Sequence, residues 1–336
     1  LACGIVHVVF PRCHRPVSLP RKMAQIGRMI NTGPDVIDAT TPAGLDRLLA
    51  GIDPARVVLI AGPTAAGKSA LALRIAQETG RAVVNADALQ VWSCWRVLTA
   101  RPSVQDEAAA PHLLYGHVAP GRSYSVGDWL AEVGALLRTG RGLVIAGGTG
   151  LYLSALTRGL AVIPPVPPEI RAQGDAWLAR DGGLAGMIAA LDARTRAGLD
   201  LRNPARVQRA WEVLAATGRG LADWQADTPP PLVPPEQAQR FVLQMDRDVL
   251  AERIARRFDA MLEAGALDEV RAMLPRWDPR AQWARAIGAA ELAEHLSGRL
   301  TLAEARERAV IATRQYAKSQ RIWFRNRMRD WTKLLV

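Results

Sequence analysis

The chain has 336 residues, of which 49% are hydrophobic and 22% are charged. These proportions are ordinary for a globular protein, exclude an intrinsically disordered chain and allow a sizeable core. Basic residues outnumber acidic ones by 43 to 32, and the resulting net charge of +11 favours a polyanionic partner, although an arginine-rich composition raises the charge of any protein.

Cysteine usage and hydropathy limit the cellular compartments in which the protein is expected to work. The three cysteines form an odd and sparse set, which argues against a disulfide framework and favours a reducing compartment, so we expect a cytoplasmic protein. No apolar run approaches the ~20 residues that a bilayer span requires, and we therefore expect no association with a membrane.

The N-terminal segment has an unusual composition. Residues 1–34 contain basic but no acidic side chains. This fits a transit peptide, but we favour a translated upstream extension, because Met23 or Met29 could serve as a start. We expect residues 1–50 to form a poorly ordered N-terminal extension.

Short apolar runs alternate with helical patterns in the next part of the chain. Strands are predicted at 56–61, 81–85 and 142–146, and helices at 68–78 and 126–138. Strands that alternate with helices are typical of a parallel, doubly wound sheet. The predicted fold class is therefore α/β with a parallel sheet. The phosphate-binding motif at residues 62–69 indicates that this sheet is of the P-loop NTPase-like kind.

Proline clusters divide the second half of the chain. Prolines at 164, 165, 167 and 168 make a stiff break, and a second cluster covers 229–235. The segment from Pro168 to about Gly218 reads as helical, Phe241 to Gln244 as a returning strand, and the rest as helical. We predict a P-loop catalytic core at 51–163, a helical insertion at 164–235, and a return to the core with C-terminal basic helices at 236–336.

A phosphate-binding motif lies between the first predicted strand and helix. It fits the pattern G-x-x-x-x-G-K-[ST] and consists of Gly62, Pro63, Thr64, Ala65, Ala66, Gly67, Lys68 and Ser69. Its backbone N–H groups approach phosphate oxygens, the lysine adds a point charge, and the serine can hold Mg²⁺. The motif predicts diphosphate or triphosphate binding without identifying the ligand as ATP.

Two further loops are predicted at the same edge of the sheet. Asp87 follows the second strand, where a carboxylate can bind Mg²⁺ or act as a general base, although a lone loop Asp is more often a cap or turn residue. Thr149 stands in a Gly-Gly-Thr-Gly turn after the third strand. Because that strand does not end in an acidic residue, the pattern of an ATPase is weakened.

Together these pieces resemble the tRNA dimethylallyltransferase family. The resemblance is carried, in order, by GPTAAGKS (62–69), NADALQVW (85–92), TARP (99–102), YSVGDW (124–129), GGTGLYLSAL (147–156), RNPARVQRAWEVLAATG (202–218), ARAIGAAE (284–291) and TRQYAKSQRIWFR (313–325). It implies transfer of a dimethylallyl group from dimethylallyl diphosphate to N6 of adenosine 37, which must leave its base stack.

The resemblance also implies roles for individual residues. The P-loop holds the diphosphate, Lys68 and Thr149 assist catalysis, Ser69 helps to hold the Mg²⁺ cofactor, and Asp87 is the general base. Arg247 matches an arginine associated with the diphosphate. The residues implied to contact the tRNA anticodon stem-loop are Asp87, Ala88, Leu89, Gln90, Arg171, Ala205, Arg206, Val207, Gln208, Arg209 and Arg285. We expect a monomer.

Two helices present basic faces that could bind RNA or merely be solvated. In the helix capped by Asn203, Arg206 and Arg209 lie roughly opposite Val207, Trp211 and Leu214. In the last long helix, one face carries Arg314, Lys318, Arg321 and Arg325, and the other carries Ala309, Ala312, Tyr316 and Trp323. The insertion is interpreted as a movable clamp over the anticodon arm.

Three alternatives remain at this point. A small-molecule P-loop kinase shares the core but leaves the C-terminal basic helix unexplained, and an RNA-binding ATPase needs an acidic residue that we cannot place. An inactive family member is suggested by departures from the pattern: Ala88 in place of Ser, Arg96-Val97-Leu98 in place of Asp-Ile-Gly, and Ala289 in place of Tyr.

Overall fold

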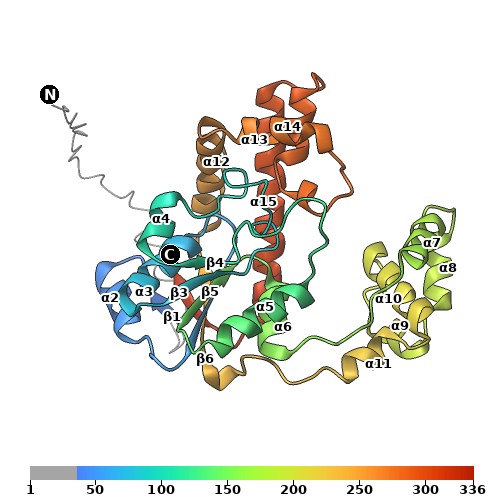
Figure 1. Cartoon of the computed structure of the whole chain (residues 1–336), viewed down its shortest axis with the longest axis horizontal. Coiled ribbons are helices and arrows are strands. Elements are labelled where there is room, and N and C mark those ends of the chain that lie inside the picture. The colour runs from blue at the N-terminus through green and yellow to red at the C-terminus, as the bar shows by residue number, and fades with distance from the viewer. Residues whose placement is uncertain (1–35) are drawn as a thin grey trace. The chain divides into compact units, whose positions relative to one another are not determined.

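The computed structural model describes residues 36–336, which contain a seven-stranded sheet in the order β1-β7-β6-β2-β5-β3-β4 (Figure 1). The pairings among β2 to β7 are all parallel, which confirms the predicted α/β class. The strands are β1 (Val36–Asp38), β2 (Val57–Ala61), β3 (Ala82–Asn85), β4 (His112–Leu113), β5 (Leu143–Gly147), β6 (Ala238–Gln244) and β7 (Thr332–Leu335).

Helices cover both faces of this sheet because its central strands are apolar on both sides. On one face, Leu59 and Ile145 join a core with α5 (Val126–Arg138) and α6 (Gly150–Arg158). On the other face, Ile60 and Val144 pack with α3 (Lys68–Thr79), while the short α4 (Val104–Ala109) lies beside α3. This arrangement is the doubly wound sheet that the alternating pattern predicts.

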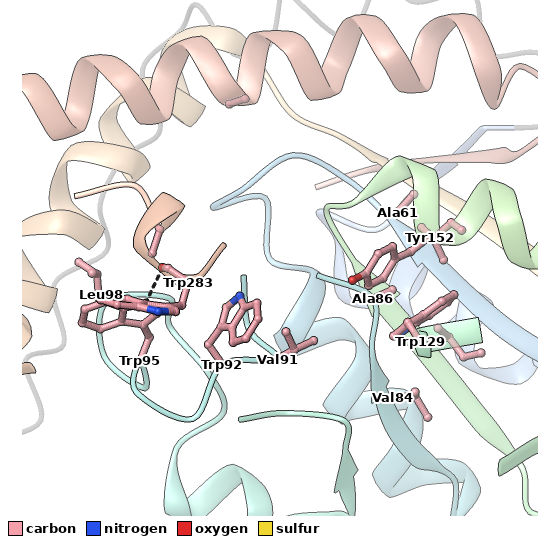
Figure 2. Packing of buried hydrophobic residues seen from close by; sticks show 14 of the residues in the cluster. Ala61, Val84, Ala86, Val91, Trp92, Trp95, Leu98, Trp129, Tyr152 and Trp283 are labelled. Atoms are coloured by element: carbon pink, nitrogen blue, oxygen red, sulfur yellow. Dashed lines mark hydrogen bonds between the residues drawn. The ribbon is translucent and has the colours of Figure 1, made fainter. Parts of the chain in front are cut away.

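The larger core is rich in tryptophan, and Figure 2 shows Trp129 beside Tyr152 and Trp95 beside Trp283. Trp129 stacks on Tyr152 with ring centroids 4.7 Å apart and donates a hydrogen bond of 2.7 Å to the backbone oxygen of Asn85. Trp95 donates one of 2.8 Å to the backbone oxygen of Trp283 (Figure 2). The satisfied indole donors of Trp129 and Trp95 allow these two side chains to be buried, whereas the buried Nε1 of Trp92 has no hydrogen-bond partner.

The insertion consists of helices (Figure 1), and these have a small core of their own. They are α7 (Pro168–Leu178), α8 (Gly183–Ala190), α9 (Ala193–Gly198), α10 (Pro204–Thr217) and α11 (Leu221–Ala226). Asn203 caps α10 by accepting the backbone N–H of Arg206, and Gly218 ends it with a φ of 68°, as predicted. Met187 and Val207 are fully buried at the centre of this cluster.

The chain then returns to the sheet and ends in a long helix. The remaining helices are α12 (Arg247–Glu263), α13 (Ala266–Met273), α14 (Ala289–Leu296) and α15 (Leu302–Arg327), with 3₁₀ turns at Pro235–Gln237, Leu274–Arg276 and Trp283–Arg285. Thr301 and Glu304 form a capping box at the start of α15. Arg314, Lys318, Arg321 and Arg325 are all exposed on α15, which confirms the predicted basic face.

Two sequence-based expectations are wrong. Residues 36–50, expected to belong to a poorly ordered extension, form β1 and the helix α2 (Pro42–Ala50), whose Leu48 is buried against the sheet. Residues 332–335, expected to be helical, form β7 because β6 offers an edge for parallel pairing and Leu334 is buried there. The expectation for residues 1–35 lies outside the described part of the chain.

Within residues 36–336, no helix combines the length and the hydropathy that crossing a membrane would require.

Candidate active site

The P-loop connects β2 to α3 and presents unused backbone donors. Gly67 precedes α3 with a φ of 93°, a left-handed conformation that favours glycine, and no side chain caps the first turn of the helix. The N–H groups of that turn are therefore free to bind an anion. Lys68 Nζ folds back and donates a hydrogen bond of 2.8 Å to the backbone oxygen of Pro63.

A single cavity brings the P-loop together with residues from distant parts of the chain. Lys68 and Ser69 line it from the P-loop, and Asp87 lines it from the loop after β3. Arg257 of α12 and Tyr316 of α15 close it from the C-terminal helices. The predicted proximity of the phosphate-binding loop and the carboxylate is thus confirmed.

The cavity wall has an apolar part as well as a charged part. Most of its larger apolar side chains come from the loop after β3, from α12 and from the turn before α14, and they include Leu89, Leu98, Ile254, Phe258, Met261 and Ile287. An apolar wall beside a cationic anion site suits a ligand that joins a hydrocarbon group to a phosphate.

The charges inside the cavity act on one another. Burial lowers the pKa of Lys68 from 10.5 to about 8, an effect that the charge of Asp87 opposes and that of Arg257 reinforces. Burial also lowers the pKa of Arg257, again opposed by Asp87. Both cations are therefore incompletely compensated, and a bound polyanion would stabilise their charged forms.

The position of Asp87 is fixed by a network at the end of β3. The side chain of Asn85 accepts the N–H of Asp87 at 2.8 Å and donates to its backbone oxygen at 2.9 Å. One carboxylate oxygen of Asp87 accepts the N–H of Leu89 at 3.0 Å. The other oxygen is left to accept a proton or to meet a ligand.

Thr149 supports this loop from the neighbouring strand. Its hydroxyl oxygen accepts the N–H of Ala88 at 3.0 Å, one residue beyond Asp87. The preceding Gly147 lines the cavity, and a Cβ atom at that position would overlap the backbone of Ala86. Thr149 is not among the lining residues of the described cavity, so the structure gives it a holding contact on the Asp87 loop.

Of the predicted tRNA-contacting residues, only those beside Asp87 reach the cavity. Leu89 and Gln90 line it, and Gln90 Nε2 also donates hydrogen bonds to the backbone oxygens of Thr99 and Ala100, at 2.8 and 2.9 Å. Arg285 is exposed in a 3₁₀ turn before α14. Ala88 holds its loop through its N–H, as described above.

The other predicted tRNA contacts lie on the insertion. Arg171 of α7 and Ala205 and Arg206 of α10 are exposed, and Arg209 is half-buried. Gln208 is engaged by Asp175 and Glu212, with hydrogen bonds of 2.6 and 3.0 Å. Val207 is fully buried in the insertion core, so its side chain is not available to an RNA, and its place on the inner face of α10 explains why.

Arg247 is not brought to the cavity. It is the first residue of α12 and is exposed, whereas Arg257 lies ten residues further along the same helix and lines the cavity. At 1.5 Å per residue, this spacing separates the two positions by about 15 Å along the helix. The diphosphate role of Arg247 stays a prediction, and the structure supplies Arg257 as a second cation.

Sequence reasoning did not identify Arg257, Tyr115 or Tyr316 as cavity residues. Arg257 stands among many arginines and has no local signal, and Tyr316 is predicted on the face of its helix opposite the basic residues. Burial and then the charge of Asp87 raise the pKa of Tyr115 and of Tyr316, so both phenols remain protonated. Tyr316 lies in the stretch 313–325, which resembles the tRNA dimethylallyltransferase family, and this resemblance is the signal in the sequence that points to it.

A divalent cation would find few protein ligands here. Residues 36–336 contain no group of three or more His, Cys, Asp or Glu side chains with metal-binding geometry. Ser69 nevertheless presents a hydroxyl to the cavity beside the P-loop amides. This donor set fits Mg²⁺ held mainly by phosphate oxygens and water, and it does not fit a cage made of protein ligands.

The parallel sheet, the P-loop and the cavity define an α/β P-loop protein with a candidate phosphate-binding loop next to a carboxylate. The chain belongs to the IPP transferase family, whose profile matches residues 90–327, and the Isopentenyl transferase profile matches residues 55–115.

Known relatives and structures agree with this assignment. The tRNA dimethylallyltransferase of Paracoccus denitrificans is 70% identical over 84% of this chain and 96% of its own. That of Dinoroseobacter shibae is 65% identical over 82% and 93%. Among solved structures, a eukaryotic dimethylallyltransferase acting on tRNA shares 25% identity with a TM-score of 0.68 over 80% of this chain and 69% of its own. A Bacillus halodurans tRNA isopentenylpyrophosphate transferase shares 29% identity with a TM-score of 0.59 over 84% and 89%.

Proposed function

We propose that the protein transfers the dimethylallyl group of dimethylallyl diphosphate to N6 of adenosine 37 in tRNA and releases diphosphate. The observation that carries this proposal is the cavity in which Lys68 and Arg257 face Asp87 beside an apolar wall. Each part of the donor and the acceptor has a chemical counterpart in that cavity.

The cationic part of the cavity suits the leaving group. Cleavage of the bond between C1 of the prenyl group and the diphosphate oxygen puts negative charge on that oxygen. Lys68, Arg257 and the free N–H groups at the start of α3 are placed to stabilise this charge. Mg²⁺, held by the diphosphate and the Ser69 hydroxyl, would supply further Lewis-acid stabilisation.

Asp87 suits the acceptor. As the bond between N6 and C1 forms, the amino group loses a proton, and the carboxylate of Asp87 is the base that can take it. The network of Asn85, Leu89 and Thr149 keeps the loop in place during this step. The apolar wall holds the prenyl group and keeps water away from the reactive C1 atom.

The adenine must leave its stack to reach a cavity of this kind. The exposed Arg171 and Arg206 on the insertion and the basic face of α15 are proposed to hold the RNA backbone. We further propose that the enzyme acts as a monomer, since one chain supplies both the phosphate-binding loop and the base, and that it works in the cytoplasm, where tRNA is available.

The experiment is transfer from labelled dimethylallyl diphosphate to tRNA in the presence of Mg²⁺. Nucleoside analysis should show N6-dimethylallyladenosine, and a tRNA with guanosine at position 37 should remain unlabelled. Family membership favours this outcome over a kinase or an ATPase, which would instead turn over ATP without labelling tRNA. If neither the tRNA with adenosine at position 37 nor the tRNA with guanosine there became labelled, and ATP was not turned over, the result would support the inactive alternative.

A further inference from the structure

A buried amide on α15 joins the two loops that frame the cavity. Gln320 is 5% exposed. Its Oε1 atom accepts the backbone N–H of Thr64, in the P-loop, at 2.9 Å, and its Nε2 atom donates to the backbone oxygen of Gly148 at 2.9 Å. One side chain therefore connects the phosphate-binding loop to the turn after β5.

One of these loops belongs to the proposed leaving-group site, and the other supports the proposed base. Thr64 lines the cavity in the P-loop, and its hydroxyl also receives a hydrogen bond from Arg257 at 3.4 Å. Gly148 precedes Thr149, which holds the loop of Asp87. A change in the position of Gln320 would thus alter the distance between the leaving-group site and the base.

The fit of α15 against the turn after β5 is close. A Cβ atom on Gly148 would overlap Gln320 Nε2 and would lie 3.2 Å from the carboxylate of Asp87. A Cβ atom on Gly150 would overlap the ring of Trp323, less than one turn further along α15. At Gly150 a side chain would have to displace a rigid indole ring, so the turn after β5 packs directly against α15.

We propose that Gln320 is a positioning residue for prenyl transfer: it sets the distance between the diphosphate cradle and the Asp87 loop. This inference rests on the proposed function. An amide suits the task, since one buried acceptor and one buried donor are needed from a single side chain. Gln320 is not among the residues that line the cavity, and it acts through Thr64 and Gly148.

Two variants distinguish the effect of the length of the residue 320 side chain from the effect of its two hydrogen bonds. Gln320→Met keeps the length but forms neither hydrogen bond, and Gln320→Asn keeps the amide but is one methylene too short to reach both loops. Misplacement of reacting groups by about 1 Å can lower a rate by about 10²-fold, so we expect kcat to fall between about 10-fold and 10²-fold in both variants. Gln315→Met, on the exposed face of α15, is the matched control and should keep the wild-type kcat.

Binding should change much less than turnover. The cradle groups at residues 65–69 and the basic face of α15 are intact in these variants. We therefore expect the Kd of inorganic diphosphate with Mg²⁺, measured by calorimetry, and the KM for tRNA to change by less than about threefold. A merely structural residue would lower the melting temperature without this split between kcat and KM.

The outcomes are distinct. The inference would be overturned if both variants kept kcat within about threefold of wild type. It would also be overturned if both variants lost diphosphate affinity as strongly as kcat. If Gln320→Met does not fold, Gln320→Asn decides. Failure of the proposed function appears separately, because the wild-type protein would then not label tRNA at all.

Discussion

Lys68 and Asp87 line the same cavity although they follow β2 and β3, two strands that β5 separates in the sheet. The carboxyl ends of parallel strands meet at one edge, and this topology places a cation and a base on the two sides of a bound ligand. The charge of Asp87 opposes the effect of burial on the pKa of Lys68.

The first prediction is a pH dependence. Because the pKa of Lys68 in the free protein is lowered to about 8, its ammonium group loses its proton as the pH rises through that value. We expect kcat/KM for the prenyl diphosphate to fall above about pH 8, while kcat falls less because the bound anion stabilises the charged lysine. Lys68→Met should abolish the descending limb, and an unchanged limb in that variant would assign it to another group.

The second prediction concerns the arginine that the structure adds. Arg257→Gln removes a half-buried cation from the cavity and should lower kcat/KM for the prenyl diphosphate about 10²-fold. Arg256→Gln, at the exposed neighbouring position, should stay within about twofold of wild type. Steady-state kinetics at saturating tRNA measure both, and equal effects of the two substitutions would contradict the assignment.

The third prediction tests the holding role of Thr149. Thr149→Val leaves the N–H of Ala88 without its hydrogen-bond acceptor, whereas Thr149→Ser retains an oxygen there. The valine variant should lose about 10-fold in kcat with little change in the Kd of diphosphate, and the serine variant should lose much less. A serine variant as impaired as the valine variant would show that the hydrogen bond to Ala88 is not what matters.

Local patterns made the core of this site predictable. The P-loop, its flanking strand and helix, and the loop residue Asp87 are each specified by a few neighbouring residues, so the sequence was sufficient. The third side of the cavity was not predictable in this way, because Arg257 and Tyr316 reach it, and Gln320 reaches the P-loop beside it, through the packing of α12 and α15. Helical periodicity showed which face of α15 is buried, but it did not show what that face meets.

Edge elements of the sheet escaped prediction for a similar reason. Short strands such as β4 and β7 carry little signal of their own, and they form because a neighbouring strand offers unpaired backbone groups. Thr41 and Pro42 are a normal helix start, and they do predict α2 when they are considered alone. The preceding residues 1–34 lack acidic side chains, however, and this composition favours an extension that continues through residue 50.

The fourth prediction concerns the departures from the family pattern. Leu98 is buried and lines the apolar wall, and a Cβ atom on Gly288, beside Ala289, would lie 3.1 Å from its side chain. Leu98→Ala should enlarge this end of the cavity and raise the kcat/KM ratio of geranyl over dimethylallyl diphosphate by about 10-fold or more. Competition between the two donors measures the ratio, and Val104→Ala, at an exposed position, should leave it unchanged. An unchanged ratio in Leu98→Ala would place the prenyl group elsewhere.

The most direct test of the account is the single-turnover rate of prenyl transfer to tRNA by Asp87→Asn, with Asp181→Asn at an exposed turn as the control. Loss of the base should slow transfer by about 10²-fold to 10⁴-fold while diphosphate still binds, and the control should match the wild type. Transfer by Asp87→Asn at the wild-type rate would contradict the claim that this carboxylate takes the proton from the adenosine.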